Sequence, residues 1–267
     1  MNDGAHLQTQ LLNNRRTADA WERYTWHRQR LADLIAAASI GKPIPTVCIL
    51  GAGNLNDIDL AQLLQRFHRV VLVDIDREAV VFGVERQSQC ACDQIEIVAP
   101  WDITGCLFGQ HGQQHNEKVC PLSIPGGPFD IVLSAGLLSQ LFQSIVTTGA
   151  VTHPRLEFLL QVRRQHLQLL LQSIKSDGTA IFVTDVVSSV TVPGLEHVPE
   201  SSLGNLLEQL LGERNFFIGT HPRTIEREID QLAVEHQLSI KTTVHPPWLW
   251  QIGPDKRHLM WGMTIQK

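Results

Sequence analysis

The chain has 267 residues and 43% hydrophobic content, enough for one large core, and its 22 Lys and Arg against 27 Asp and Glu form no concentrated basic run. This charge pattern lacks the positive footprint of a nucleic-acid or anionic-membrane binder, so we expect neither partner. No uncharged apolar run reaches about 18 residues, and the polar start lacks a secretory signal. Five cysteines, an odd number, suit reduced thiols, so we expect a cytoplasmic globular protein.

The first 45 residues are expected to form a helical extension. Within a helical region at 7–40, large residues recur every three or four positions: Trp21, Tyr24, Arg28, Leu31, Leu34 and Ile35. The segment Gly41-Lys42-Pro43-Ile44-Pro45 then interrupts the helix. We expect the extension to pack on the edge of a sheet rather than to cover a substrate.

Residues 46–267 alternate between apolar strands and amphipathic helices. Strands are predicted at 46–50, 70–73, 95–98, 129–133 and 179–184, and helices after the first strand, at 77–87 and at 154–175. Asn56 is expected to cap the first of these helices, and Ser176-Asp177-Gly178 to form a turn. Such alternation predicts a doubly wound α/β fold with helices on both faces of a parallel sheet.

The end of the chain departs from this alternation. After helices at 202–211 and 222–236, two strands are predicted at 238–244 and 257–266, joined by a turn-rich loop that contains Pro246-Pro247-Trp248. Strands joined by a short loop pair as an antiparallel hairpin. The sequence therefore predicts a Rossmann-like seven-stranded sheet, mostly parallel, with a C-terminal antiparallel hairpin.

A glycine turn, Gly51-Ala52-Gly53, directly follows the first predicted strand. Glycine permits backbone conformations closed to other residues and allows a ligand to approach the main chain. About 20 residues further on, Asp74 ends the second strand, where a doubly wound sheet places the acid that accepts ribose hydroxyls. This spacing predicts a site for an adenosine-bearing cofactor.

From Thr46 onward, the chain resembles the class I S-adenosylmethionine-dependent methyltransferases. The matching pieces are Leu50-Gly51-Ala52-Gly53, Val73-Asp74-Ile75-Asp76, Trp101-Asp102-Ile103, the strand at 129–134, the approach to strand 179–184 and the terminal hairpin. The resemblance implies S-adenosylmethionine as cofactor and S-adenosylhomocysteine as product. It implies that the glycine turn faces the methionine portion, Asp74 the ribose, Ile75 the adenine ring and Asp102 the adenine amino group, with the Ile103 amide beside the ring.

Two further residues complete the expected cofactor site, Asn54 and Ser134. The family's usual further glycine is absent, and Leu55-Asn56 stands in its place. We expect Asn54 and Asn56 to keep the turn tight, because Asn tolerates left-handed backbone better than most residues.

A dinucleotide is the main rival cofactor. A pyrophosphate favours a helix N-terminus with a third glycine, which this turn lacks, and Asp57 and Asp59 would place negative charge beside its phosphates. S-adenosylmethionine carries an ammonium and a sulfonium and no phosphate, so the charges favour it over NAD.

The acceptor half of the site is less defined. The segment that starts at Ser134 lacks the Asn-Pro-Pro-aromatic motif of enzymes that methylate bases or glutamine, and its small apolar residues suit a small-molecule acceptor. Catalytic methyl transfer can require a base. His27, His153 and His245 flank the predicted rim, although exposed or capping roles weigh more for each, and we assign no catalytic residue. His258 and Trp261 are expected in the core or on the sheet surface.

Cys106, His111, His115 and Cys120 supply zinc-type ligands within one polar loop. They lack the usual Cys-x2-Cys knuckle, so we expect a solvated insertion and no bound metal.

Three functions remain open. The first is methylation of a small molecule, the second is a non-catalytic binding protein that retains the methyltransferase-like fold, and the third is an NAD-dependent oxidoreductase. The sequence identifies neither the acceptor nor the oligomeric state.

Overall fold

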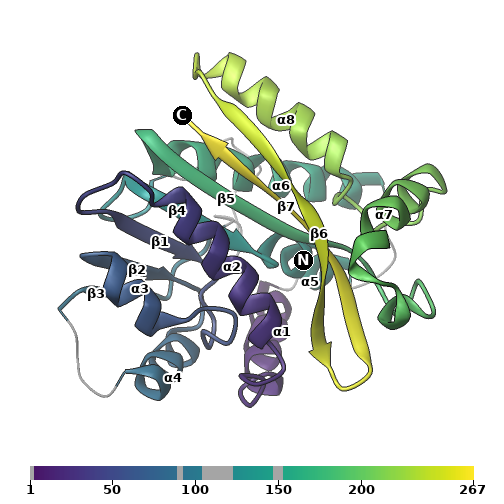
Figure 1. Cartoon of the computed structure of the whole chain (residues 1–267), viewed down its shortest axis with the longest axis horizontal. Helices are drawn as coiled ribbons and strands as arrows, with labels where there is room; N and C mark the ends of the chain where they lie inside the picture. Colours follow the sequence, from purple (N-terminus) through teal and green to yellow (C-terminus); the bar gives the residue numbers. More distant parts are fainter. Residues whose placement is uncertain (1–2, 89–92, 104–122, 147–152) are drawn as a thin grey trace.

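A seven-stranded sheet with the strand order β3-β2-β1-β4-β5-β7-β6 crosses the molecule (Figure 1). The computed structural model describes residues 3–88, 93–103, 123–146 and 153–267. Five strands run parallel: β1 (Thr46–Leu50), β2 (Arg69–Val73), β3 (Ile95–Val98), β4 (Phe129–Ala135) and β5 (Ile174–Ser188). β7 (Lys256–Gln266) pairs antiparallel with β5 and with β6 (Lys241–Gly253). The predicted sheet and its C-terminal hairpin are confirmed.

Strand β1 lies at the centre of the parallel part, and all five of its residues are buried. A parallel strand covered on both faces reads as a continuous apolar run, which explains the sequence Thr46-Val47-Cys48-Ile49-Leu50. Leu50 pairs in register with Val73 of β2 and with Ser134 of β4. The residues that follow these strands therefore meet along one side of the sheet, which we call the carboxyl edge.

Helices cover both faces of the sheet (Figure 1). On one face, the core includes side chains of α2 (Thr25–Ala38), α3 (Leu60–Arg66) and α4 (Arg77–Gln87). On the other, it includes side chains of α5 (Leu137–Val146), α6 (His153–Ser173), α7 (Leu203–Gly212) and α8 (Pro222–Glu235). Two 3-10 turns, η1 (Leu195–His197) and η2 (Glu200–Ser202), precede α7. Alternate residues of β1 enter the two cores, so the predicted doubly wound arrangement is confirmed.

The helical region predicted at 7–40 consists of two helices, α1 (Asp3–Arg16) and α2, and residues 17–24 between them form turns. Trp21 and Tyr24 therefore precede α2 instead of sharing its face. Tertiary hydrogen bonds explain the break, because Arg28 donates to the carbonyl of Trp21 (2.9 Å) and Arg86 donates to the carbonyl of Ala18 (3.1 Å). Arginine side chains therefore satisfy these two carbonyls, in place of the backbone amides that would bond to them in a continuous helix.

The prediction that Pro246-Pro247-Trp248 forms the hairpin loop is wrong. Strand β6 continues through these residues, and its register with β7 shifts between His245 and Trp248. Because β6 lies at the edge of the sheet, its prolines sacrifice no hydrogen bonds to a further strand. The turn itself is formed by Pro254 and Asp255. Likewise, the turn predicted at Ser176-Asp177-Gly178 lies within β5, where the register with β4 shifts.

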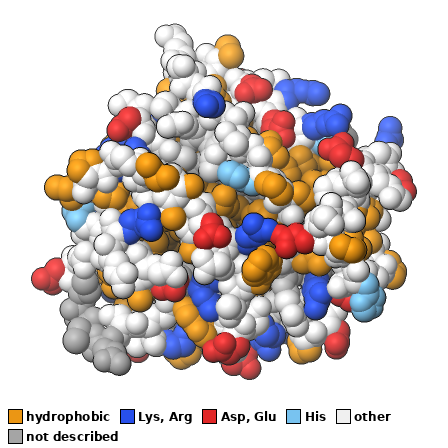
Figure 2. Space-filling model, viewed as in Figure 1, with side chains coloured by type: hydrophobic (Ala, Val, Ile, Leu, Met, Phe, Trp, Pro, Cys, Tyr) orange, Lys and Arg blue, Asp and Glu red, His pale blue; other side chains and the backbone are white. Residues whose placement is uncertain are grey.

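In the described part of the chain, no helix is long and apolar enough to cross a membrane. On the face shown in Figure 2, acidic and basic side chains of the described residues lie interspersed, and neither sign gathers in a continuous patch.

Candidate functional site

A cleft of about 860 Å³ follows the carboxyl edge of the sheet. Its volume falls within the range of roughly 300–1,000 Å³ that small-molecule sites occupy. One half is lined by residues at or after the ends of β1–β4: Gly51, Ala52, Gly53, Asn54, Asp74, Ile75, Trp101, Asp102, Ile103, Ala135 and Gly136. The other half is lined by residues of β5, the β6–β7 hairpin and the segment before α8: Asp185, Ser188, Phe216, Phe217, Ile218, Trp250, Ile252, Lys256 and His258. We call these the glycine-turn half and the hairpin half.

The glycine turn adopts the left-handed backbone that its residue types predict, with φ of +71° at Gly51 and +47° at Gly53. The amides of Gly51 and Ala52 donate to the carbonyl of Val73 at 2.9 and 3.1 Å, which fixes the turn against the end of β2. A Cβ on Gly51 would also lie 3.0 Å from Leu137 Cδ1. Both the backbone angle and this close approach therefore favour glycine at position 51.

Asp74 lies beside this turn and is only 7% exposed. Its Oδ2 accepts a hydrogen bond from the amide of Gly53 (2.8 Å), and its Oδ1 accepts one from the amide of Asp76 (2.7 Å). Burial raises the pKa of Asp74 to about 6, although both amide bonds act in the opposite direction. Each carboxylate oxygen keeps a second lone pair, so this fixed acid can accept hydrogen bonds from a diol in the cleft.

The cleft brings together all the predicted cofactor residues except Ser134. Asn54, Ile75, Asp102 and Ile103 line the same half as Asp74. Ser134 is fully buried and its Oγ lies 2.8 Å from His166 Nε2, within the apolar core. Burial lowers the pKa of His166 to about 4, so the ring is neutral at pH 7.

Asp57 also lines the glycine-turn half of the cleft. Burial raises its pKa to about 6, and the negative charge of Asp74 adds to that shift. Asp57 and Asp59 do not act as a pair at the helix start, because Asp59 alone caps α3 by accepting from the amide of Gln62 (3.0 Å). The prediction that Asn56 caps this helix is wrong.

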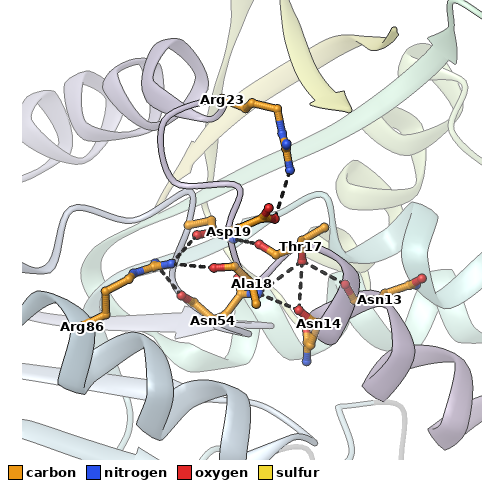
Figure 3. A network of polar contacts seen from close by, with 9 residues as sticks. Asn13, Asn14, Thr17, Ala18, Asp19, Arg23, Asn54 and Arg86 are labelled. Atoms are coloured by element: carbon orange, nitrogen blue, oxygen red, sulfur yellow. Dashed lines mark hydrogen bonds and ion pairs between the residues drawn. The ribbon is translucent and has the colours of Figure 1, made fainter. Parts of the chain in front are cut away.

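The two asparagines near the turn, Asn54 and Asn56, hold the N-terminal segment instead, and Figure 3 shows the contacts of Asn54. Asn54 Nδ2 donates to the carbonyl of Asn14 (2.9 Å) and to Thr17 Oγ1 (3.2 Å), and Asn56 Nδ2 donates to the carbonyl of Thr17. The left-handed residue after the glycines is Leu55, with φ of +54°. The expectation that Asn54 and Asn56 supply left-handed backbone is therefore wrong, because their side chains serve tertiary contacts.

Helix α1 lies along the cleft, whereas α2 packs on the sheet. Asn14 Nδ2 donates to Asp76 Oδ2 (3.0 Å) after β2, and Gln10 Nε2 donates to the carbonyl of Gln140 (3.2 Å) in α5. Gln10, Asn13, Asn14, Arg16 and Thr17 line the cleft. The helix thus reaches from one side of the opening to the other.

The hairpin half of the cleft contains an acid–imidazole pair that the sequence analysis missed. Asp185 Oδ2 lies 2.6 Å from His258 Nδ1, and both residues line the cleft. His258 was expected in the core or on the sheet surface. Only the register of β5 and β7, which pairs Ser188 with His258, brings the two residues together, and no local motif announces it.

The histidines proposed as candidate bases lie elsewhere. His27 is 1% exposed, accepts a hydrogen bond at Nδ1 from Trp248 Nε1 (3.0 Å) and has a pKa lowered to about 3 by burial. His245 is on β6 and outside the cleft lining, and burial lowers its pKa. The side chain of His153 lies outside the described residues.

The predicted loop with Cys106, His111, His115 and Cys120 also lies outside the described residues. Within the described ranges, no group of three or more His, Cys, Asp or Glu side chains is placed to hold a metal ion.

Comparison of sequences finds no matching protein-family model and no matching curated protein. Comparison of structures finds the YcgJ protein of Bacillus subtilis, which is 11% identical over 90% of this chain and 98% of its own, with a TM-score of 0.50. A putative S-adenosylmethionine-dependent methyltransferase of Methanococcus maripaludis is 12% identical over 93% of this chain and 90% of its own, with a TM-score of 0.47. The magnesium protoporphyrin IX methyltransferase of Synechocystis, solved with bound SAH, is 12% identical over 92% and 86%, with a TM-score of 0.45. At these identities, the similarity is one of fold.

Proposed function

We propose that this chain, which has the fold of the class I methyltransferases, binds S-adenosylmethionine and transfers its methyl group to a small-molecule acceptor. Asp74 carries the proposal. It is a buried acid whose two oxygens are held by the amides of Gly53 and Asp76 at the mouth of a glycine turn. A ribose diol is the part of the cofactor that such a fixed acceptor suits.

The other residues of the glycine-turn half fit the remaining parts of the cofactor. Ile75 and Ile103 offer apolar surface for the adenine ring, and Asp102, in the segment after β3, offers an acceptor for its amino group. Asp57 and Asp74 are anionic at pH 7 and suit a ligand with an ammonium and a sulfonium, while Arg16 and Arg23 also line the cleft and offer positive charge to a carboxylate. The lining therefore offers charge of both signs to the three charged groups of S-adenosylmethionine.

S-adenosylmethionine supplies a methyl group on a positively charged sulfur, which is already activated for displacement. The protein has to orient the acceptor and exclude water. The hairpin half of the cleft extends beyond the glycine turn and has an apolar wall that includes Phe216, Phe217 and Trp250. This second compartment favours an enzyme with an acceptor over a protein that only binds the cofactor.

NAD fits the same cleft less well. Its pyrophosphate would lie against the glycine turn, where Asp57 also lines the cleft and adds negative charge. Phosphates favour unpaired backbone amides, whereas the amides of Gly51 and Ala52 donate to the carbonyl of Val73 and that of Gly53 donates to Asp74.

Calorimetric titration with S-adenosylmethionine, S-adenosylhomocysteine and NAD in parallel tests the proposal. We expect micromolar binding of the first two and none of NAD. Binding of NAD alone would replace the proposal by the oxidoreductase, and absence of all binding would refute it.

A further inference from the structure

The acid–imidazole pair in the hairpin half is not among the residues that the proposed function assigns to the cofactor. Asp185 lies near the end of β5 and is 4% exposed, and His258 lies on β7 and is 8% exposed. Their 2.6 Å contact is buried, yet both residues line the cleft. A pair with this geometry fixes both the orientation of the imidazole ring and the position of its proton.

An ionised carboxylate only accepts hydrogen bonds, so Asp185 requires the proton of a neutral His258 to be on Nδ1. Nε2 then presents a lone pair. Among the described residues, this buried nitrogen has no hydrogen-bond partner. A buried acceptor left without a donor is costly, and a donor group on a ligand in the cleft would satisfy it.

The surroundings of His258 indicate the rest of that ligand. The Phe217 ring lies 5.9 Å from the His258 ring, and Trp250 is the register partner of His258 on β6. The Trp250 ring also lies 3.3 Å from the place of a Gly136 Cβ, at the end of β4. Aromatic surface thus connects the pair to the glycine-turn half, which suits a flat, ring-bearing molecule between the two.

We propose that His258 accepts the proton of a hydroxyl group on a ring-bearing acceptor and that Asp185 positions it; this inference rests on the proposed function. The acceptor oxygen forms its bond to the methyl carbon with a lone pair, the carbon–sulfur pair stays with sulfur, and the hydroxyl proton passes to the Nε2 lone pair. Asp185 then faces an imidazolium, and the proton is later lost to water. A carboxylate acceptor suits the pair less, because it has no proton to remove at neutral pH and would face Asp185.

The position of the imidazole proton can be measured without any ligand. In protein labelled with ¹⁵N-histidine, two-bond ¹H–¹⁵N correlations report which ring nitrogen is protonated, and the His258→Phe spectrum assigns the signal. We expect Nδ1–H at His258 in the neutral ring and Nε2–H in Asp185→Asn, whose amide donates to Nδ1. Protonation of Nε2 in the wild-type neutral ring would overturn the inference.

A comparison of two ligands tests whether Nε2 of His258 accepts a hydrogen bond. The probes are phenol and anisole, which share a ring but differ in the hydroxyl proton, titrated into protein saturated with S-adenosylhomocysteine. We expect phenol to bind about tenfold more tightly, and His258→Phe and Asp185→Asn to remove that preference. His197→Gln is the matched control, because His197 pairs with Glu196 (3.6 Å) on the surface, with 83% of its side chain exposed.

The outcomes separate this inference from the proposed function. If S-adenosylhomocysteine binds but wild type does not distinguish phenol from anisole, the inference fails and the cofactor assignment stands. If S-adenosylhomocysteine does not bind, the proposed function fails, and the inference fails with it. Retained S-adenosylhomocysteine binding in Asp185→Asn and His258→Phe shows that a lost preference is not a loss of fold.

Discussion

At the scale of single residues, environment gives the same side chain different tasks. Asp74 is oriented by two amides at the cleft, whereas Asp130 binds Lys175 (2.9 Å) and Thr46 (2.7 Å) at the other end of the sheet. Burial raises the pKa of Asp74, while the hydrogen bonds of Asp130 outweigh burial and lower its pKa. Acids with a perturbed pKa in a cleft are enriched at functional sites, which favours Asp74 over Asp130 as the one that meets a ligand.

Replacement of Asp74 should weaken the cofactor without unfolding the chain. We expect Asp74→Ala to lower the affinity for S-adenosylmethionine by roughly 1.5–3 kcal/mol, because hydrogen bonds to the ribose are lost. Calorimetry measures the change. Asp177→Ala is the control, because that side chain is 77% exposed and lies at the opposite end of β5. Equal affinities of Asp74→Ala and wild type would show that the acid does not contact the cofactor.

The affinity for S-adenosylmethionine should fall in acid. Asp57 and Asp74 both have pKa values raised to about 6, so they are ionised at pH 7.5 and largely neutral at pH 5. Protonation removes the negative charge that faces a cationic ligand and weakens charge-assisted hydrogen bonds. Titrations from pH 5 to 8 should show constant affinity above about pH 7 and a decline below about 6. The decline should be smaller in Asp57→Asn and Asp74→Asn, and a pH-independent affinity would contradict the assignment.

At the scale of elements, the glycine turn depends on a neighbour that its own motif does not contain. A Cβ on Gly83 of α4 would lie 2.6 Å from the carbonyl oxygen of Asn54. Helix α4 can therefore approach the turn closely only at this position. The turn has Leu55 and Asn56 where the family has a further glycine. Gly83 of α4, on the other side of the contact, lets the helix and the turn approach closely.

Gly83→Ala should consequently destabilise the protein. Overpacking against backbone costs roughly 1–3 kcal/mol, more than alanine's better helix propensity returns. Denaturant unfolding gives the change in free energy. Gly204→Ala in α7 is the matched control, because nothing lies within 4 Å of its new Cβ, and it should be neutral or stabilising. If both variants behaved alike, the close contact at Gly83 would have no energetic effect.

At the scale of the whole molecule, the buried histidines make the fold sensitive to acid. The pKa of His27 is lowered to about 3 and that of His166 to about 4, below the value near 6.5 in an unfolded chain. The folding stability that depends on these neutral rings is complete above about pH 6.5. It is lost as the pH falls towards their pKa values in the folded state. Asp57 and Asp74 act oppositely, since their raised pKa values make the folded state less costly in acid.

A single variant isolates the effect of His166 on the pH dependence of stability. Between pH 7.5 and pH 5, wild type should lose roughly 2 kcal/mol of unfolding free energy relative to His166→Gln. Urea unfolding at the two pH values measures this difference. His236→Gln, at an exposed position after α8, should follow wild type. Parallel behaviour of His166→Gln and wild type would mean that His166 is not kept neutral by the fold.

The sequence predicts those elements whose position depends on residues close together in the chain. The strand at 46–50, the helix at 77–87 and the acid after β2 depend on apolar runs, caps and spacing, and the structure has them at those residues. Helix α5 was missed because Gly136 and the small residues before it indicate a loop. The Asp185–His258 contact and the bonds of Asn54 and Asn56 join residues far apart in the chain, so no local pattern reports them.

Residues from 10–17 and from 250–258, far apart in the sequence, both line the cleft. They belong to the region of α1 and to the β6–β7 hairpin, which Figure 1 labels. A ribosome releases residues 10–17 well before residues 250–258. The nascent chain can therefore form β1 and the glycine turn early, while the hairpin wall arrives only with the last strands. The complete cleft therefore exists only after β7 has been synthesised.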